Sequence, residues 1–303
     1  MNFVILDLEW NGTYSRRRKG FMNEIIEFGA IKVDDSLRIL DTFESLVRPQ
    51  VGKKISGKIR TLTNITNEEL ANGSQFLQVM SRFRKWMGEA VLMTWGTADI
   101  LALIDNNQYF GAGERISFLE EYVDLQSYCE HMLDYTAAGQ MGLSTSAQLL
   151  KINESDLTHH RALDDSMLSL RCLRRLYKKN ALLPFIQNAR TDEFYEKITF
   201  KTTIICDLSN PLIKRSDLAF YCALCGRRAL REGEWQLKNK SYRADFRCRT
   251  CTHRFTGKVQ FKLKYDGLVV KKGVLPFKEK PKVEEDEPCS TPVKCLKSTG
   301  RSR

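Results

Sequence analysis

Two carboxylates stand where the first apolar stretch of the chain, residues 3–6, ends. Asp7 and Glu9 are two residues apart, and in a strand such residues point to the same face. Neighbouring carboxylates repel each other unless a cation lies between them. Because Mg²⁺ and Mn²⁺ prefer oxygen ligands, the pair is a candidate site for a divalent metal. For this pair alone, the alternative is a strand that turns polar where it reaches the surface.

Two later stretches carry side chains of the same chemistry. Asp99 follows the apolar stretch 90–94, at a strand end where active-site residues gather, although an Asp there is also a common N-cap. His160 and Asp165 stand at the start of an amphipathic helix and lie off its apolar face. Taken alone, the histidine also fits a surface turn, and the aspartate also fits a first-turn charge that complements the helix dipole. Together, carboxylates from three elements can hold one or two Mg²⁺ ions, and a histidine can accept a proton from an attacking water. The set favours two-metal phosphodiester hydrolysis.

Cysteines of the last third form a second candidate metal site. Cys222, Cys225, Cys248 and Cys251 have the spacing CxxC-x22-CxxC, which supplies four thiolates for a tetrahedral, structural Zn²⁺ in a zinc ribbon. Redox CxxC pairs are the alternative, and two pairs in one basic, strand-rich segment argue against it. Because four cysteines complete the coordination, His253 is not expected as a ligand. Buried thiols are expected at three further positions: Cys129, Cys172 and Cys206.

The elements that must position the carboxylates predict an α/β domain. Asn11-Gly12 is typical of a turn after the first strand. Apolar runs and periodicity predict further strands at 24–33, 39–47, 90–94 and 121–125, and helices starting near residues 76, 128, 144 and 163. A strand meander followed by alternating helices and strands predicts a mixed sheet flanked by helices.

Charge divides unevenly along the 303 residues, whose formal net charge is +11. Residues 1–185 carry 22 Lys+Arg and 23 Asp+Glu, a net of −1, while residues 186–303 carry 26 and 14, a net of +12. A basic module usually binds a polyanion, most often nucleic acid, with a merely solvated basic surface as the alternative. We predict a catalytic domain at 1–185, a linker strand and a basic, β-rich zinc-ribbon domain at 186–277, and a disordered tail at 278–303.

Other features of the sequence indicate where the protein acts and what it binds. No apolar run approaches the roughly 20 residues of a membrane span, so no membrane partner is expected. The chain enters a core strand at residue 3 without a basic leader, which predicts a cytoplasmic protein with reduced thiols. Aromatic residues among the basic ones of the second domain favour nucleic-acid binding, unless they form a small core around the metal. These aromatics are Tyr221, Trp235, Tyr242, Phe246 and Phe255.

Three motifs in order carry a family resemblance. DLE at residues 7–9, TWGTAD at 94–99 and HHRALDDS at 159–166 resemble the exonuclease motifs of the DEDDh superfamily of 3′–5′ exonucleases, an RNase-H-like group. The branch of histone-mRNA and small-RNA exonucleases and KapD-type proteins is the most similar. The resemblance covers roughly residues 1–180 and implies an RNase-H-like mixed sheet. It also implies removal of nucleoside 5′-monophosphates from single-stranded 3′ ends, with RNA slightly favoured over DNA.

Site roles follow from the resemblance, position by position. Asp7, Glu9 and Asp165 would bind the Mg²⁺ or Mn²⁺ ion that activates the nucleophile, and Asp7 with Asp99 would hold a second such ion at the leaving 3′ oxygen. His160 would be the general base. The motif's alanine, Ala162, matches His160 as the base, and His159 and Asp164 are then neighbours.

Several interpretations remain open at this level. Trp10, where the family often has Thr or Ala, either stacks a terminal base or packs in the core. The basic run Arg16, Arg17, Arg18 and Lys19 either grips phosphates or is a solvated loop. The zinc ribbon binds nucleic acid or a protein partner. A catalytically idle fold that serves as a nucleic-acid-binding or regulatory scaffold is the alternative function, and the intact set of five motif residues argues against it.

Overall fold

The computed structural model describes residues 1–136, 139–158 and 160–278. The chain divides into two compact units, Met1–Phe200 and Lys201–Arg303, which we call the N-terminal and C-terminal units. Within the described residues, no helix is both long enough and apolar enough to cross a membrane. His159, the predicted disordered tail and the tail cysteines Cys289 and Cys295 lie outside the described residues, except that Lys278 is included.

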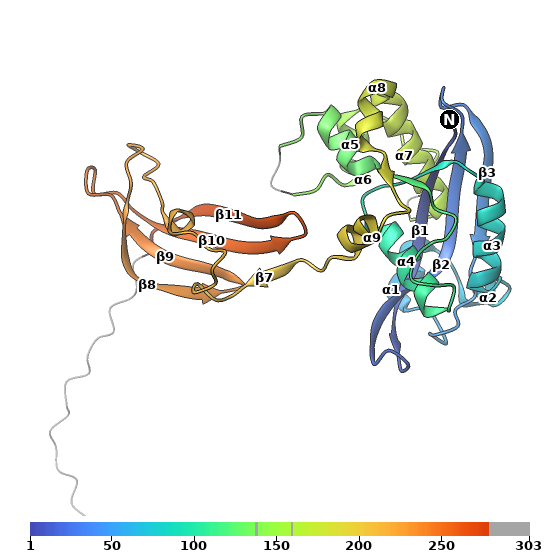
Figure 1. Cartoon of the computed structure of the whole chain (residues 1–303), viewed down its shortest axis with the longest axis horizontal. Helices are drawn as coiled ribbons and strands as arrows, with labels where there is room; N and C mark the ends of the chain where they lie inside the picture. Colours follow the sequence, from blue (N-terminus) through green and yellow to red (C-terminus); the bar gives the residue numbers. More distant parts are fainter. Residues whose placement is uncertain (137–138, 159, 279–303) are drawn as a thin grey trace, which may run out of the picture. The chain divides into compact units, whose positions relative to one another are not determined.

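A six-stranded mixed sheet forms the centre of the N-terminal unit (Figure 1), in the order β3-β2-β1-β4-β5-β6. Its strands are β1 (Phe3–Ser15), β2 (Gly20–Val33), β3 (Ile39–Leu46), β4 (Val91–Thr94), β5 (Glu121–Asp124) and β6 (Gln187–Asn188). β1, β4 and β5 run parallel to one another, while β2, β3 and β6 pair antiparallel with their neighbours. The mixed α/β fold predicted from the sequence is confirmed.

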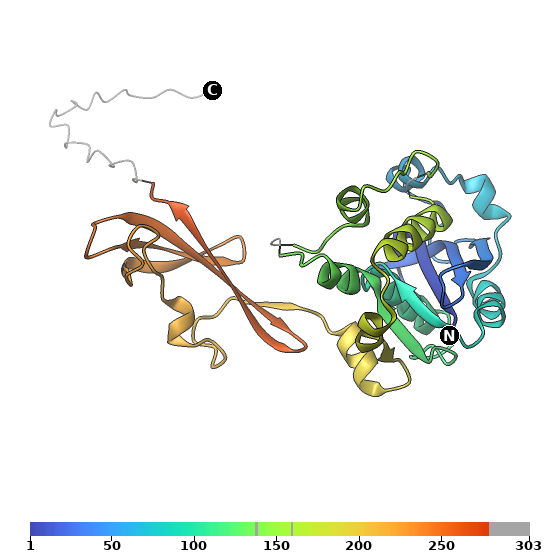
Figure 2. The same cartoon turned by 90° about the horizontal axis from the view of Figure 1, so that it is seen from above.

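Helices cover both faces of this sheet (Figure 2). They are α1 (Gly57–Thr63), α2 (Asn67–Ala71), α3 (Phe76–Met87), α4 (Ala98–Tyr109), α5 (Leu125–Met132), α6 (Leu143–Leu149), α7 (Ala162–Leu176), α8 (Lys179–Leu182), the 3-10 turn η1 (Leu183–Phe185) and α9 (Asp192–Thr199). Alternate residues of β1 face opposite layers. Val4, Leu6 and Leu8 pack with α3, α4 and α9, whereas Phe3 and Ile5 pack with α5 and α7. Both faces of β1 are therefore buried, and its end can be held rigidly.

The first hairpin differs from the prediction. Asn11-Gly12 is not a turn: β1 continues through it to Ser15, and the basic run 16–19 makes the turn to β2. A tertiary contact fixes the extended form, because the Asn11 side chain accepts a hydrogen bond from the backbone N–H of Ser56, 3.1 Å away. The hairpin consequently extends beyond the body of the N-terminal unit, as the dark blue ribbon shows (Figure 1).

The boundary between the units also differs from the predicted one. Residues 187–199 belong to the N-terminal unit, because β6 pairs with β5 and α9 buries Phe194, Tyr195 and Ile198 in the core. The linker strand expected at the start of the second domain is accordingly only the three-residue β7 (Thr203–Ile205). Periodicity in this stretch is too short to separate a strand from a helix that ends at residue 199.

The C-terminal unit is built on a five-stranded sheet in which β7 joins β11-β10-β9-β8 by pairing with β10. Its elements are the 3-10 turn η2 (Arg215–Leu218), β8 (Leu230–Lys238), β9 (Ser241–Arg247), β10 (Arg254–Lys264) and β11 (Gly267–Pro276). Tyr242, Phe246 and Phe255 are core residues, Trp235 packs partly exposed against them, and Tyr221 is exposed. Most of the aromatics interleaved with basic residues thus build the core.

Candidate active site

The free edge of β1 places the two carboxylates of the first motif. β4 pairs with β1 only from Phe3 to Ile5, so β1 runs on alone along that edge from Leu6. Asp7 and Glu9 lie on this part of β1, and the register with β2 shifts just after Glu9. Such bulges are common beside active sites, where they redirect a side chain. The early end of the pairing with β4 therefore leaves this part of β1 open to a ligand.

Asp99 reaches the same place from α4. Its Oδ1 accepts a hydrogen bond of 3.0 Å from the backbone N–H of Leu8, between the two carboxylates of β1. Asp99 is buried in the first turn of α4, which starts shortly after β4. The side chain thus satisfies a backbone donor at the free edge of β1 and brings a third carboxylate into the site.

The first turn of α7 supplies the fourth carboxylate, Asp165, and packs unusually close to β2. A methyl group on Gly29 of β2 would overlap the backbone of Ala162 and Leu163, so only glycine permits this approach. The Ser166 hydroxyl adds a 2.8 Å hydrogen bond to the carbonyl of Gly29. Asp165 is therefore held against the sheet by backbone packing and not by its own contacts alone.

Glu27 is a positioning residue that the sequence interpretation missed. Its fully buried carboxylate accepts hydrogen bonds from Arg161, the shortest 2.7 Å, and from the backbone N–H of Ala162 at 3.1 Å. It thereby anchors the start of α7 beneath the site. The sequence carries a signal, since Glu27 stands between the apolar residues Ile26 and Phe28, and a buried charge needs a partner.

The carboxylates strongly disfavour each other's ionised form. Burial raises the pKa of Asp7 well above its usual range, and the charges of Asp99 and Asp165 raise it further. Burial, then Asp165, raises the pKa of Glu9 to about 8, and burial raises that of Asp99 to about 7. Ligand atoms of Glu9, His160 and Asp165 lie within 4.8 Å of one another. This oxygen-rich, mutually repelling donor set fits a hard divalent cation, which would relieve the repulsion.

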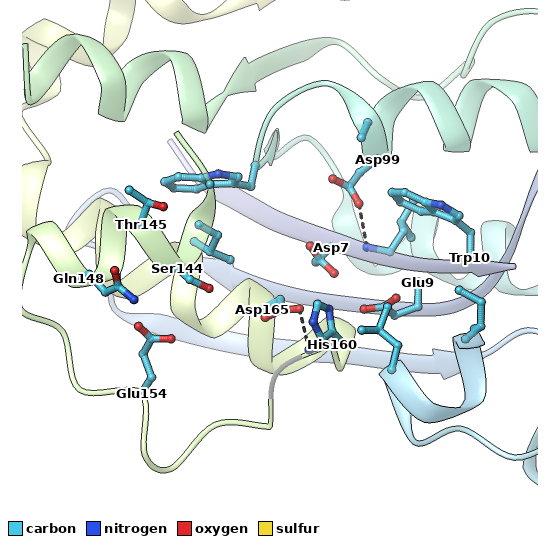
Figure 3. Close-up of a pocket in the computed structure, with 17 residues that line it drawn as sticks. Asp7, Glu9, Trp10, Asp99, Ser144, Thr145, Gln148, Glu154, His160 and Asp165 are labelled. Atoms are coloured by element: carbon cyan, nitrogen blue, oxygen red, sulfur yellow. Dashed lines mark hydrogen bonds between the residues drawn. The ribbon is translucent and has the colours of Figure 1, made fainter. Parts of the chain in front are cut away.

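His160 lies at the exposed rim of the site (Figure 3), in the left-handed backbone region with φ of 62°. Its backbone N–H donates to Oδ2 of Asp165 at 3.1 Å, which ties the loop to α7. Figure 3 shows the ring beside Glu9 and Asp165, turned toward the space that Asp7 borders. The structure thus brings all five motif residues to one cleft.

The cleft around them has a volume of about 710 Å³. Trp10 lies next to Glu9 in it, and Trp95 lines another part (Figure 3 labels Trp10). Two short helices, α1 and α6, form much of the rest of its wall, and the sequence alone does not assign them to the site. Their lining residues are Ile59, Leu62, Leu143, Ser144, Thr145 and Gln148. Apolar and hydroxyl groups facing charged ones suit a ligand with both a ring and polar oxygens.

The basic run of the hairpin turn is not among the cleft residues. Arg18 pairs with Asp105 of α4, and Arg17 donates to the carbonyl of Tyr109 at 2.9 Å. Both guanidiniums also lie over the Tyr109 ring. Two of the four basic side chains therefore tie the hairpin to α4, and phosphate binding by the run stays a prediction.

The four motif cysteines meet in the C-terminal unit as predicted. Their Sγ atoms lie within 4.8 Å of one another, with Cys222 3.4 Å from Cys251 and Cys225 3.4 Å from Cys248. These separations are too long for disulfides and close to the edges of a tetrahedron with Zn–S bonds of about 2.3 Å. Nδ1 of His253 is 3.6 Å from Sγ of Cys222, in a position to support that thiolate. We call these four residues the cysteine cluster.

Ionisation of Cys222 is favoured in this loop. Burial opposes it, but hydrogen bonds from the backbone N–H groups of Leu224 and Cys225 lower the pKa of the thiol to about 6. The cysteine cluster can therefore bind zinc. Among the other cysteines, Cys129 and Cys172 are buried as expected, whereas Cys206 is exposed, because it lies just beyond the short strand β7.

Comparison with known proteins decides the family. A family model described as Exonuclease (RNase_T) matches residues 4–173, more than half of the chain. The chain belongs to this exonuclease family. It is 30% identical over 178 residues to the PolC-type DNA polymerase III of Clostridium perfringens, and 27% identical over 165 residues to that of Staphylococcus haemolyticus. The matched regions make up 58% and 54% of this chain but only 11% and 10% of the polymerases.

Solved structures show the same fold. The nuclease domain of 3′hExo, described as a DEDDh family member and solved bound to rAMP, superposes with a TM-score of 0.51 at 24% identity, covering 57% of this exonuclease and 90% of that chain. Cell-death related nuclease 4 gives a TM-score of 0.50 at 14% identity, covering 69% of each chain. All five residues that carry the motif resemblance, Asp7, Glu9, Asp99, His160 and Asp165, line one cleft of this fold.

Proposed function

We propose that this exonuclease is metal-dependent and removes nucleoside 5′-monophosphates from the 3′ end of single-stranded nucleic acid, with RNA favoured over DNA. The convergence of four carboxylates from β1, α4 and α7 in one cleft carries this proposal: Asp7, Glu9, Asp99 and Asp165. Such a set is stable in its ionised form at neutral pH only with a cation between its members. A 3′-exonuclease whose structure shows 3′-end-specific recognition of a histone mRNA stem-loop shares the fold and supports the preference for RNA.

The proposed role of each residue follows from its position in the cleft. Asp7, Glu9 and Asp165 would hold one Mg²⁺ or Mn²⁺ ion, and Asp7 with Asp99 a second. When bound, these ions supply positive charge for the scissile phosphate and lower the pKa of a water. The His160 imidazole, at the solvent side of the cleft, accepts the proton of the attacking water. Water attack with release of the 3′ oxygen leaves the phosphate on the 5′ carbon of the departing nucleotide.

Trp10 and the walls of the cleft would bind the terminal nucleotide. Trp10 is half-buried against the core, which fixes its ring, while one part of it lines the cleft beside Glu9. Stacking of a base on such a ring contributes roughly 1–3 kcal/mol and tolerates any base. Both earlier interpretations of Trp10, packing and stacking, are compatible with this position.

The test compares two adjacent aspartates of α7. Single-stranded RNA and DNA of one sequence, labelled at the 5′ end, are incubated with Mg²⁺, Mn²⁺ or chelator. We expect a metal-dependent ladder that shortens from the 3′ end, slowed by at least about 10²-fold in Asp165→Asn. Asp164→Asn is the control, because Asp164 does not line the cleft and accepts a hydrogen bond from Thr158 instead. No shortening of either strand by the unsubstituted protein would contradict the proposal and leave a scaffold.

A further inference from the structure

A groove of about 860 Å³ lies on the C-terminal unit, which carries none of the five exonuclease motif residues. Arginines come to it from separate elements: Arg215 from η2, Arg231 from β8, and Arg228 and Arg249 from the loops that carry the cysteines. Trp235 of β8 lines it as well. We call this surface, formed by the four arginines and Trp235, the arginine groove.

The cysteine cluster positions two of these arginines. Arg228 follows the Cys222–Cys225 loop, in which the backbone N–H of Cys222 donates to the carbonyl of Arg227 at 2.8 Å. Arg249 lies inside the second loop, directly after Cys248, whose backbone N–H donates to the carbonyl of His253 at 2.9 Å. A metal on the four thiolates would fix both loops, and so the spacing of the two guanidiniums across the groove.

The groove carries positive charge without internal compensation. Within residues 201–278 there are 18 Lys+Arg against 6 Asp+Glu, a net of +12. Among the described residues, none of the four groove arginines forms a salt bridge, whereas nearby Arg254 is paired with Glu232 at 2.8 Å. Cations gathered along a concave wall attract an anion that can accept from several guanidiniums.

An aromatic ring lies among these cations. Trp235 is partly exposed and is held by Phe246, with ring centroids 5.8 Å apart, while the guanidinium of Arg231 lies 5.8 Å from its centroid. A ring fixed by the core and flanked by arginines matches the pattern of single-strand sites, where phosphates meet cations and bases stack on aromatics. A duplex would present phosphates but keep its bases inside.

We propose that the arginine groove binds a single strand of nucleic acid, with phosphates on Arg215, Arg228 and Arg249 and a base against Trp235. This goes beyond the proposed nuclease activity, because it concerns retention of a strand by the C-terminal unit and not cleavage. The strand can be RNA or DNA, since guanidinium–phosphate contacts and stacking require neither sugar.

Fluorescence anisotropy of a labelled 20-nucleotide single strand tests the proposal. All proteins are full-length, carry Asp7→Asn to prevent cleavage, and are measured without Mg²⁺. The double substitution Arg228→Ala/Arg249→Ala is expected to weaken binding 10- to 100-fold and to reduce the slope of log Kd against log salt by about 1.4, at about 0.7 per phosphate contact. Arg227→Ala is the matched control: it removes an exposed arginine of the same loop that does not line the groove.

Further variants keep the result interpretable. Zinc content by atomic emission confirms that each protein retains its metal site. Arg215 lies in η2, outside both cysteine loops. Arg215→Ala should therefore weaken binding about 5- to 10-fold without altering those loops. Equal affinities of the groove variants and the Arg227→Ala control would overturn the proposal, as would an acidic peptide that displaces the strand at equal concentration. Cleavage of a trinucleotide by the protein without Asp7→Asn reports separately on the proposed nuclease, so the two can fail independently.

Discussion

The two candidate metal sites of this chain are built in opposite ways. We call the four carboxylates of the cleft, Asp7, Glu9, Asp99 and Asp165, the carboxylate cluster. It lies in a unit with extensive cores on both faces of its sheet, and a strand or a helix holds each of its residues. The cysteine cluster lies on two loops of a unit whose largest core has eight buried residues. In the first, the fold holds the ligands in place against their mutual repulsion; in the second, the ligands complete the fold.

The carboxylate site is therefore suited to a catalytic metal, and the cysteine cluster to a structural metal. Burial and neighbouring charges raise the pKa values of the carboxylates, so cations that enter the cluster relieve a repulsion that the fold maintains. Backbone N–H groups lower the pKa of Cys222, so that thiolate is favoured before any metal arrives. Removing the metal should therefore affect the two sites differently. The following predictions test this contrast.

Zinc removal should have the largest effect. A structural zinc contributes roughly 10–16 kcal/mol to the folding of a small domain, more than the small core of the C-terminal unit can replace. Cys248→Ser, or a strong chelator, should unfold the C-terminal unit while the N-terminal unit keeps its transition. Calorimetry of the whole chain should show one of two transitions lost.

The control for that experiment is Cys206→Ser. Cys206 belongs to the same unit, is exposed and lies outside the cysteine cluster. It should leave both transitions within about 4 °C, since surface substitutions seldom change stability by more than about 0.5 kcal/mol. A C-terminal unit that melts unchanged after chelation would mean that the cysteines are not a structural metal site.

Closing the space between β2 and α7 should have the next largest effect. Gly29→Ala puts a methyl group into the backbone of Ala162 and Leu163. The helix must move, at a cost of about 3 kcal/mol, and Asp165 moves with it. Urea unfolding should show the loss of stability, and kcat/KM should fall with it. Gly12→Ala, on the neighbouring strand with open space around it, should leave both nearly unchanged; an equal loss there would remove the close approach as the cause.

The contrast between the sites also explains what the sequence could predict. The sequence alone identifies the candidate metal-binding and catalytic residues, because these residue types seldom occur together by chance. They are the DLE motif, an Asp after a buried strand, a His followed by an Asp, and two CxxC pairs. All nine converge in the structure, five in the cleft and four in the cysteine cluster. Spacing along the chain was sufficient for the cysteines, because ligands within each pair are close together on one loop.

Supporting residues were harder to predict, since their role depends on tertiary packing. Glu27 looks like one polar position in a strand until the buried pairing with Arg161 is seen. Asn11-Gly12 has the local preference of a turn, and the contact with Ser56 overrides it. The end of the N-terminal unit was placed too early because α9 has only a short apolar pattern and its burial is set by distant residues of the core.

The smallest expected effect is a difference in pH dependence between the two units. In metal-free protein, the folded state keeps protons on Glu9 and Asp99 up to about pH 8 and 7, whereas the unfolded chain releases them near pH 4. The unfolded state then binds fewer protons, so stability of the N-terminal unit falls as pH rises from about 4.5 to 8. The C-terminal unit should show the opposite sign. The pKa of Cys222 is lowered from 9.0 to about 6, so its contribution is lost as pH falls through this range.

Melting curves from pH 5 to 8 separate these trends. Glu9→Gln should flatten the decline of the N-terminal transition in chelator-free, Mg²⁺-free buffer, because the substitution removes one of the raised groups. Saturating Mg²⁺ should remove the decline in the unsubstituted protein, since a ligand that binds only the folded state stabilises it. Glu89→Gln, an exposed residue after α3, should keep the original slope. If the N-terminal unit did not lose stability as pH rises, the carboxylates would not be held against their repulsion, and the cleft would be an ordinary, solvated acidic surface.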